Sequence, residues 1–252
     1  MAAYQLVKEL RKLSKTVSIR IITKDSGDYY SKPLLSTAFA KNKTAAELVM
    51  TSAQQMHENF DIEVIAHCEV NAIDTKNKSL ATTHGTFTYS KLILATGASP
   101  IKIPVPGSTT ENTLSINDLD DFEKFRLKVS NKTHVIIMGG GLIGCEYAND
   151  LAQTGVKVTI VDIQEQLLSQ LIPAPVSAFL VKELAKHGID VQLGCSVSSV
   201  ATVKGGIEVT LSNGATLSAG ILLSAVGLKP QLDLAQSANI ACNKGIMVNT
   251  RM

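Results

Sequence analysis

The sequence predicts an α/β protein with two strand–helix–strand units, the first of which lacks its opening strand. Two observations support this prediction. Strand-like and helix-like segments alternate over much of the chain, a pattern typical of a mostly parallel sheet covered on both faces. In addition, a glycine-rich turn, Gly139-x-Gly141-x-x-Gly144, lies directly between a predicted strand and a predicted helix.

In the first part of the chain, apolar spacing predicts a helix over residues 2–14 and a strand over 17–23. Thr44 and Glu47 form a capping box, which predicts a helix over 45–59. Further short strands are expected at 63–66, 70–74, 87–89 and 92–94.

The proline-rich stretch 100–107 is stiff and extended, and we expect a domain boundary there. The second part of the chain repeats the alternation of strands and helices. Helices are expected at 117–129, 142–153 and 176–187, and strands at 134–138, 156–161 and 221–225. Asn213-Gly214 marks a hairpin turn.

Composition excludes several classes of protein. The chain has 252 residues, of which 45% are hydrophobic and 18% charged, so it can bury a core and is not disordered. Its formal net charge of +2 is too small to indicate nucleic-acid binding. No apolar run reaches about 18 residues, so no membrane span is expected, and the first residues lack the features of a secretory signal.

The cysteines and histidines show no pattern of a redox or metal site. The four cysteines lie at positions 68, 145, 195 and 242 and form no CxxC or CxxxxC pair, which excludes a local redox disulfide. Reduced thiols in a cytoplasmic protein are the simplest interpretation. The five histidines lack the spacing of metal ligands, so no metal site is predicted.

The glycine turn has the residue types that a dinucleotide pyrophosphate requires. Gly139 permits the tight turn, Gly141 lets a phosphate approach the backbone, and Gly144 lets helix and strand pack closely. Leu142 and Ile143 open the helix, whose N-terminal N–H groups and positive dipole favour phosphates.

An acidic residue at the end of the next predicted strand favours one cofactor. Asp162 is suited to accept hydrogen bonds from ribose hydroxyls. A carboxylate there repels a 2′-phosphate, and the four residues that follow include no Arg or Lys. The sequence therefore predicts NAD(H) rather than NADP(H).

Six sequence blocks, through their order and spacing, resemble the two-dinucleotide-binding-domain flavoproteins of the pyridine-nucleotide-disulfide oxidoreductase fold. The blocks are YYSKPLLSTAF (29–39), LILATGASPIKIPVPG (92–107), INDLDDFEKFR (116–126), GGGLIGCEYANDL (139–151), SAVGLKP (224–230) and GIMVNTRM (245–252). The resemblance implies two Rossmann-like domains, with FAD across the first and NADH docking from the second. It divides the chain into an FAD-binding part at 1–104, an inserted NAD(H)-binding domain at 105–228 and a return into the FAD-binding domain at 229–252.

The resemblance also implies roles for individual residues. Lys32, followed by Pro33, is expected beside the flavin N5, where it stabilises negative charge on the reduced ring, and Glu146 is expected to pair with it. Asp25 matches the acidic residue that holds the FAD adenosine ribose. The other positions implied to contact FAD or the nicotinamide are Ala3, Val70, Ala95, Thr96, Gly97 and Gly227.

The missing cysteine pair selects a branch of the family. Disulfide reductases of this fold carry a redox CxxxxC near the flavin, and the peroxidase and oxidase branch carries one cysteine in the segment equivalent to 34–39. This chain has Leu-Leu-Ser-Thr-Ala-Phe there. Electrons are therefore expected to leave the flavin directly for a one-electron carrier, with rubredoxin the first choice and a ferredoxin of an oxygenase system the second.

Basic residues gather in the first predicted helix, and two interpretations stay open. Lys8, Arg11, Lys12 and Lys15 form either a solvated helix face or a surface that steers an acidic carrier. Steering would make the rate of carrier reduction fall as ionic strength rises.

Both ends of the chain depart from the family pattern. Met1-Ala2-Ala3 aligns only with the last three positions of the FAD fingerprint, and residues 248–252 stop before the family's Gly-Asp segment. We therefore expect an internal fragment of a longer enzyme that binds FAD weakly or not at all by itself. Two function classes stay open, an NADH-dependent flavoprotein reductase and a non-catalytic NAD-binding module.

Overall fold

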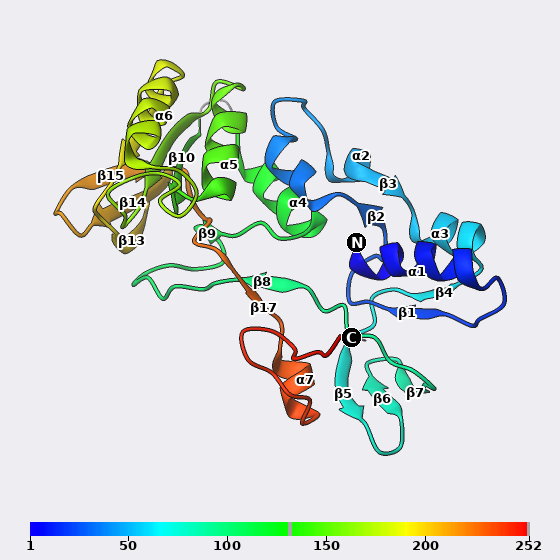
Figure 1. Ribbon diagram of the computed structural model, residues 1–252. Helices are drawn as coiled ribbons and strands as arrows, with labels where there is room; N and C mark the ends of the chain where they lie inside the picture. The colour runs from blue at the N-terminus through cyan, green and yellow to red at the C-terminus, as the bar shows by residue number, and fades with distance from the viewer. Residues whose placement is uncertain (131–132, 251–252) are drawn as a thin grey trace. The chain divides into compact units, whose positions relative to one another are not determined.

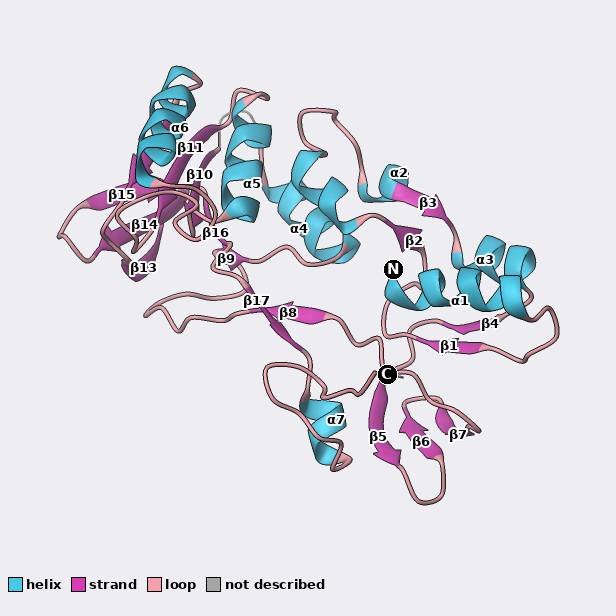
Figure 2. Cartoon of the chain, in the orientation of Figure 1, coloured by secondary structure: helices cyan, strands magenta, loops and turns pink. Residues whose placement is uncertain are grey.

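The computed structural model describes residues 1–130 and 133–250 and confirms the α/β fold (Figure 1 and Figure 2). Contacts divide the chain into two compact units, which are described in turn. Unit 1 comprises Met1–Ser31, Val49–Ser99 and Lys229–Met252, and unit 2 comprises Lys32–Leu48 and Pro100–Leu228. The expected limits of the two binding domains stay a prediction. Arg251 and Met252 of the last resemblance block lie outside the described residues.

A five-stranded sheet forms the centre of unit 2. Its strands lie in the order β12 (Ile189–Gln192), β11 (Lys157–Val161), β10 (His134–Met138), β16 (Ile221–Ser224) and β9 (Thr113–Leu114). Every neighbouring pair is parallel, as the alternation of strands and helices predicted. At its centre, Ile137 lies between Ile160 on one side and Leu223 on the other.

The two faces of this sheet are covered by different kinds of element. Ile137 and Ile160 pack under helices on the first face, whereas Ile136 and Leu222 point to the second face, because strand side chains alternate. The helices are α4 (Leu119–Lys128), α5 (Leu142–Ala152) and α6 (Ala174–Lys186). An antiparallel sheet of β13 (Val197–Val203), β14 (Gly206–Leu211) and β15 (Thr216–Ala219) covers the second face. The second face of the parallel sheet is therefore covered by another sheet and not by helices.

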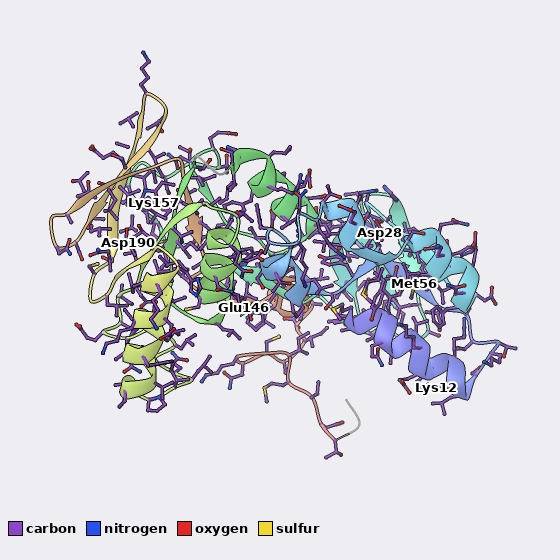
Figure 3. The ribbon with its side chains drawn as sticks, turned by 90° about the horizontal axis from the view of Figure 1, so that it is seen from above. Lys12, Asp28, Met56, Glu146, Lys157 and Asp190 are labelled. Carbon is purple, nitrogen blue, oxygen red and sulfur yellow. The ribbon has the colours of Figure 1, made fainter. Side chains whose placement is uncertain are left out.

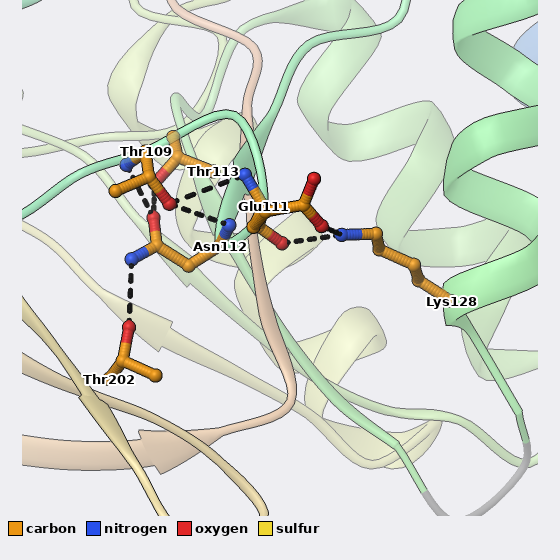
Figure 4. Close-up of polar contacts among 6 residues, drawn as sticks. All are labelled: Thr109, Glu111, Asn112, Thr113, Lys128 and Thr202. Atoms are coloured by element: carbon orange, nitrogen blue, oxygen red, sulfur yellow. Dashed lines mark hydrogen bonds and ion pairs between the residues drawn. The ribbon is translucent and has the colours of Figure 1, made fainter.

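A buried asparagine holds the start of strand β9 (Figure 4). Asn112 Nδ2 donates to Gly107 O at 3.1 Å and to Thr202 Oγ1 at 3.4 Å, and its Oδ1 accepts from Thr109 N at 2.8 Å. On the same turn, Lys128 Nζ of α4 donates to Glu111 Oε2 at 2.7 Å. These contacts hold residues 107–112, at and after the end of the proline-rich stretch, to β13 and to α4.

In unit 2 glycines form the predicted hairpin turn and end helix α6. Gly214 adopts a φ of +86° between β14 and β15, and Asn213 Oδ1 accepts from Ala215 N, as an Asn-Gly hairpin turn requires. Gly188 directly follows His187, the C-cap of α6, and has a φ of +75°. This is the left-handed conformation that ends many helices.

Unit 1 has a smaller core between a parallel strand pair and two helices. Strand β1 (Arg20–Ile22) pairs with β4 (Glu63–Ile65), and α1 (Ala2–Leu13) packs with α3 (Ala53–Phe60). Tyr4, Val7, Met56 and Ile62 are the buried members of this core. The remaining elements of unit 1 include the antiparallel sheet of β5 (Val70–Asp74), β6 (Ser79–Thr82) and β7 (Gly85–Thr88), the pair β2 (Tyr29–Tyr30) and β3 (Val49–Thr51), and helix α7 (Asp233–Ser237).

Short strands β8 (Ala98–Pro100) and β17 (Leu228–Pro230) pair with each other. A 3₁₀ helix, η1 (Lys32–Thr37), lies at the start of unit 2.

The prediction of one helix over 45–59 is wrong. The capping box of Thr44 and Glu47 is present, but helix α2 (Ala45–Leu48) ends after one turn. Val49–Thr51 then forms strand β3, which pairs with β2, and Ser52 caps the new helix α3 through Gln55 N. Hydrogen bonds to a distant strand therefore override the local helical pattern.

The expected strand at 92–94 is also wrong. These residues belong to no strand in the described part of the chain, and Ile93 is 59% exposed. An extended segment becomes a strand only when a neighbour satisfies its N–H and C=O groups.

One member of the basic cluster has a different role from either interpretation. Arg11 is 7% exposed, and its guanidinium donates to Phe60 O at 2.6 Å, to Asp61 O at 2.8 Å and to Val17 O at 2.9 Å. Arg11 therefore ties the end of α1 to the end of α3 and is not available to a carrier. Lys12 pairs with Glu9, and Lys8 Nζ lies 4.3 Å from the centre of the Tyr29 ring.

None of the helices in the described part of the chain is both long and apolar enough to cross a membrane.

We predict that unit 2 loses stability in weak acid because of His134. Its Nδ1 donates to Ser218 O at 2.7 Å, and in the neutral ring its Nε2 accepts from Thr159 Oγ1 at 2.9 Å. Burial lowers the pKa of His134, assisted by Lys157. The folded-state pKa therefore lies below the unfolded one, so this stabilisation is present above the unfolded pKa and is lost as pH falls through the folded one.

Chemical denaturation between about pH 7 and pH 5 measures this effect. His134→Gln should flatten the fall in unfolding free energy, whereas His187→Gln, at an exposed histidine of unit 2, should leave the slope of the parent. Equal slopes in the parent and His134→Gln would contradict the assignment.

Candidate functional site

The glycine turn between β10 and α5 depends on contacts that only glycine permits. Gly139 has a φ of +115°, and a Cβ at this position would lie 2.5 Å from Ala225 O. A Cβ at Gly144 would lie 1.9 Å from Gly139 O. Both glycines therefore allow the first turn of α5 to rest on the turn and the end of the sheet, which is the role predicted for Gly144.

The middle glycine of the motif leaves a free approach to the backbone. A Cβ at Gly141 would meet no heavy atom of the described residues within 4 Å. Gly141 is also the N-cap of α5, no side chain caps this end, and the first turn holds no acidic residue. Leu142 and Ile143, at 53% and 39% exposure, follow it. This helix start offers uncapped N–H groups and a positive dipole to an anion.

Asp162 lies against the turn, as predicted for the acidic residue at the end of β11. Its Oδ2 accepts a hydrogen bond from Gly140 N, and its Oδ1 accepts from Gln164 N at 2.7 Å. The carboxylate is half-buried, and each oxygen retains a second lone pair for a ribose hydroxyl.

Sequence reasoning missed the glycine that Asp162 contacts. A Cβ at Gly140 would lie 2.6 Å from Leu167 Cδ2 and 3.1 Å from Asp162 Oδ2. The three consecutive glycines at 139–141 are the signal that could have revealed this position.

A small hollow lies at the carboxyl end of the parallel strands in unit 2. Its volume is about 20 Å³, roughly that of one water. Ile143, Tyr147, Ser224 and Gly227 contribute to its lining, so the predicted nicotinamide position Gly227 shares a site with the glycine motif. Burial raises the pKa of Tyr147, which keeps its hydroxyl protonated.

The expected ion pair between Lys32 and Glu146 does not form in the described residues. Lys32 lies at the exposed start of η1, where its Nζ donates to Asn117 Oδ1 at 3.2 Å. Glu146, which Figure 3 labels on α5, accepts instead from the buried Ser36 Oγ at 2.5 Å. Both belong to unit 2, and Glu146 binds the short segment that begins with Lys32 without pairing with Lys32 itself. Their roles beside a flavin stay predictions.

The residues expected to hold the FAD adenosine lie in unit 1. Asp25 Oδ1 accepts from Thr23 Oγ1 at 2.7 Å and from Gly27 N at 2.9 Å, whereas Oδ2 has no partner among the described residues. This exposed oxygen fits a ribose hydroxyl. Ala3 lies in the first turn of α1, and Val70 begins β5.

The turn Ala95-Thr96-Gly97 is held to a later segment of unit 1. Thr96 Oγ1 donates to Gln231 O at 3.0 Å, and Gln231 N donates to Gly97 O at 3.1 Å. Gly97 has a φ of +70° and open space where a Cβ would lie. The turn is therefore fixed while its backbone stays accessible.

Within residues 1–130 and 133–250, no group of three or more His, Cys, Asp or Glu side chains is placed to hold a metal ion. The four cysteines are free, and three of them are buried. Burial raises the pKa of Cys145 to about 11, so this thiol is not an activated nucleophile.

Comparison with known proteins identifies the family. The family model described as "Pyridine nucleotide-disulphide oxidoreductase" matches residues 1–252. The chain is 39% identical over 250 residues to a "Rubredoxin-NAD(+) reductase" of Alcanivorax borkumensis, covering 99% of this chain and 65% of that protein. It is 39% identical over 249 residues to a "Nitric oxide reductase FlRd-NAD(+) reductase" of Aeromonas salmonicida, covering 98% of this chain and 64% of that protein. The chain thus spans less than two thirds of these relatives.

Two solved structures are similar over nearly the whole chain. A ferredoxin reductase for the CYP199A2 system of Rhodopseudomonas palustris has a TM-score of 0.90 and 26% identity, covering 98% of this chain and 61% of that chain. Putidaredoxin reductase, in a covalent complex with putidaredoxin, has a TM-score of 0.89 and 25% identity, covering 100% of this chain and 61% of that chain.

Two glycine substitutions should separate folding from binding. Gly141→Ala should leave the thermal midpoint of the parent because its methyl group meets only open space. It should weaken NADH binding by about 10-fold, because we expect that space to receive the pyrophosphate. Gly144→Ala should destabilise unit 2 by about 2 kcal/mol or more, since its Cβ overlaps Gly139 O. Thermal melts and NADH titration measure both effects. Unchanged NADH affinity in Gly141→Ala would exclude the turn as the pyrophosphate site.

Proposed function

Because the chain belongs to the pyridine nucleotide-disulphide oxidoreductase family, we propose that it is part of an FAD-dependent reductase that passes electrons from NADH to a small one-electron carrier. The observation that carries this proposal is the glycine turn. Gly141 leaves the start of α5 open, and Asp162 lies against that opening. This combination suits the pyrophosphate and the ribose of NADH.

The residues of unit 2 bind and orient the dinucleotide in this proposal. The N–H groups at the start of α5 bind the pyrophosphate, and Asp162 accepts from the ribose hydroxyls. Gly227 and Ile143, which share the hollow beside the turn, border the nicotinamide. Tyr147 remains neutral there because burial raises its pKa.

The flavin, when bound, accepts electrons as a pair and releases them singly. Asp25 Oδ2 accepts from the adenosine ribose, and Val70 borders the adenine. Ala3 and the Ala95–Gly97 turn approach the cofactor through backbone. Lys32, which Pro33 follows in the chain, stabilises the negative charge that reduction places on the flavin ring. Glu146 supplies a negative charge that offsets the positive charge of Lys32 on this segment.

Rubredoxin is the proposed acceptor, as in the name of the similar rubredoxin-NAD(+) reductase. The name of one relative at 39% identity, the rubredoxin-NAD(+) reductase, supports a rubredoxin partner. The segment 34–39 has no cysteine, so no thiol stands between flavin and carrier. A ferredoxin is the second candidate, because the similar ferredoxin reductase and putidaredoxin reductase both act with such carriers by name. The four free cysteines favour a cytoplasmic location.

A visible spectrum and a carrier assay test this function. FAD is added in excess, because the chain by itself is expected to bind it weakly, and NADH is added without oxygen, with a mixture lacking the chain as the blank. The flavin absorbance should fall faster than in the blank, and rubredoxin should restore it faster than ferredoxin or oxygen does. NADH binding without flavin reduction would favour the alternative of a non-catalytic NAD-binding module. Failure to bind NADH would contradict both.

The preference for NADH should depend on Asp162. In Asp162→Ala with Ile163→Arg, the ratio of the NADPH to the NADH dissociation constant should fall by about 10-fold or more, because a repelling carboxylate is replaced by a cation. Ile163→Arg alone is the control, since it retains the carboxylate. If the substitutions loosen the turn, the binding of both cofactors weakens equally, and the ratio of the two dissociation constants does not change for that reason. An unchanged ratio would count against Asp162 as the ribose ligand.

A further inference from the structure

A short segment of unit 2 is attached along helix α5. It begins with η1 (Lys32–Thr37) and continues through Ala38, Phe39 and Ala40. Leu35, Ser36 and Ala38 are buried. The Phe39 ring meets the rings of Phe122 and Phe125 of α4 edge-on, with centroids 5.3 and 5.5 Å apart.

Two carboxylates of α5 bind this segment. Glu146 and Asp150 are one helical turn apart, so they lie on the same side of the helix. Glu146 accepts from Ser36 Oγ. Asp150 Oδ2 accepts from Phe39 N at 2.8 Å, and its Oδ1 accepts from Ala40 N at 3.1 Å.

Asp150 is unusual because it is 4% exposed and has no ion-pair partner among the described residues. The backbone N–H groups of Phe39 and Ala40 compensate for the burial of this carboxylate, and neither residue belongs to a helix or a strand. Burial raises the pKa of Asp150, opposed by the amides of Ala40 and Phe39 and by Lys41. A buried carboxylate without such donors would be strongly destabilising, so the pairing constrains both helix and segment.

Helix α5 also begins at the glycine turn. Asp150 therefore lies about 12 Å along a rigid helix from the N-terminus that faces the dinucleotide. The hydrogen bonds that hold the segment to Asp150 therefore also fix the position of the segment along α5 relative to the glycine turn.

We propose that Asp150 is a positioning residue that fixes the segment Lys32–Ala40 on α5, so that Lys32 keeps one place relative to the dinucleotide turn. The proposal rests on the proposed function, in which Lys32 acts beside the flavin. Asp150 itself is not expected to touch NADH or the flavin.

Hydrogen exchange on the unsubstituted chain is the first test. The Phe39 and Ala40 amides should exchange about 10-fold or more slowly than amides of an unstructured loop, because they donate to a buried carboxylate. Exchange of both amides at the rate of a free peptide would overturn the proposal without any variant.

Asp150→Asn is the second test, because it keeps the side-chain volume but presents an NH₂ group to one of the two amides. Exchange at Phe39 or Ala40 should accelerate by about 10-fold, while amides in the middle of α5 and β10 change by less than about 2-fold. Asp120→Asn, at an exposed carboxylate of α4, is the matched control and should change neither. Equal loss of protection throughout unit 2 would show a general stabilising role and would overturn the proposal.

Kinetics then separate positioning from binding. Asp150→Asn should leave the NADH dissociation constant within about 2-fold of the parent but slow flavin reduction by NADH by about 10-fold, because Lys32 loses its fixed place. An unchanged reduction rate would overturn the proposal. If NADH does not reduce added FAD in the presence of the parent, the proposed function fails, and the exchange measurements still decide whether Asp150 fixes the segment.

Discussion

The close backbone contact at the start of α5 is the constraint on which the rest of unit 2 depends. Gly144 rests on the carbonyl of Gly139, and Gly139 rests on the carbonyl of Ala225, which follows β16. No side chain fits between them. The helix therefore starts directly on the carboxyl edge of the parallel sheet, with Gly141 at its open end. The position of Asp162 beside the turn and the direction of α5 across the sheet both follow from this contact.

Helix α5 combines three tasks along one element. Its apolar residues, among them Ala148 and Leu151, fill the core against the sheet. Its uncapped N-terminus faces outward at Gly141, and its carboxylates at 146 and 150 hold the segment 32–40. Because the helix is rigid, a segment held near one end keeps a fixed position relative to the other end. In this way residues 32–40, which are far from α5 in the sequence, belong to the same unit as α5.

Unit 1 shows how a charged side chain can serve the fold. Arg11 lies in a helix rich in lysine, where the sequence alone leaves open a solvated helix face or a surface that steers a carrier. Its guanidinium instead satisfies backbone carbonyls at the end of α3 and after α1, where helix and loop leave acceptors without partners. The adjacent Lys12 remains at the surface and pairs with Glu9.

The glycine turn, strands β10 and β11, helix α5 and the place of Asp162 follow from the sequence, because residues close in the chain decide them. Apolar periodicity marks the elements, and glycine spacing marks where the backbone must come close. The break of the helix at Val49, the unpaired segment 92–94, the burial of Arg11 and the separation of Lys32 from Glu146 depend on residues far away in the chain. Only the tertiary structure decides them, because a strand needs a neighbour, a buried charge needs its donors, and a carboxylate binds whichever donor packing brings within reach.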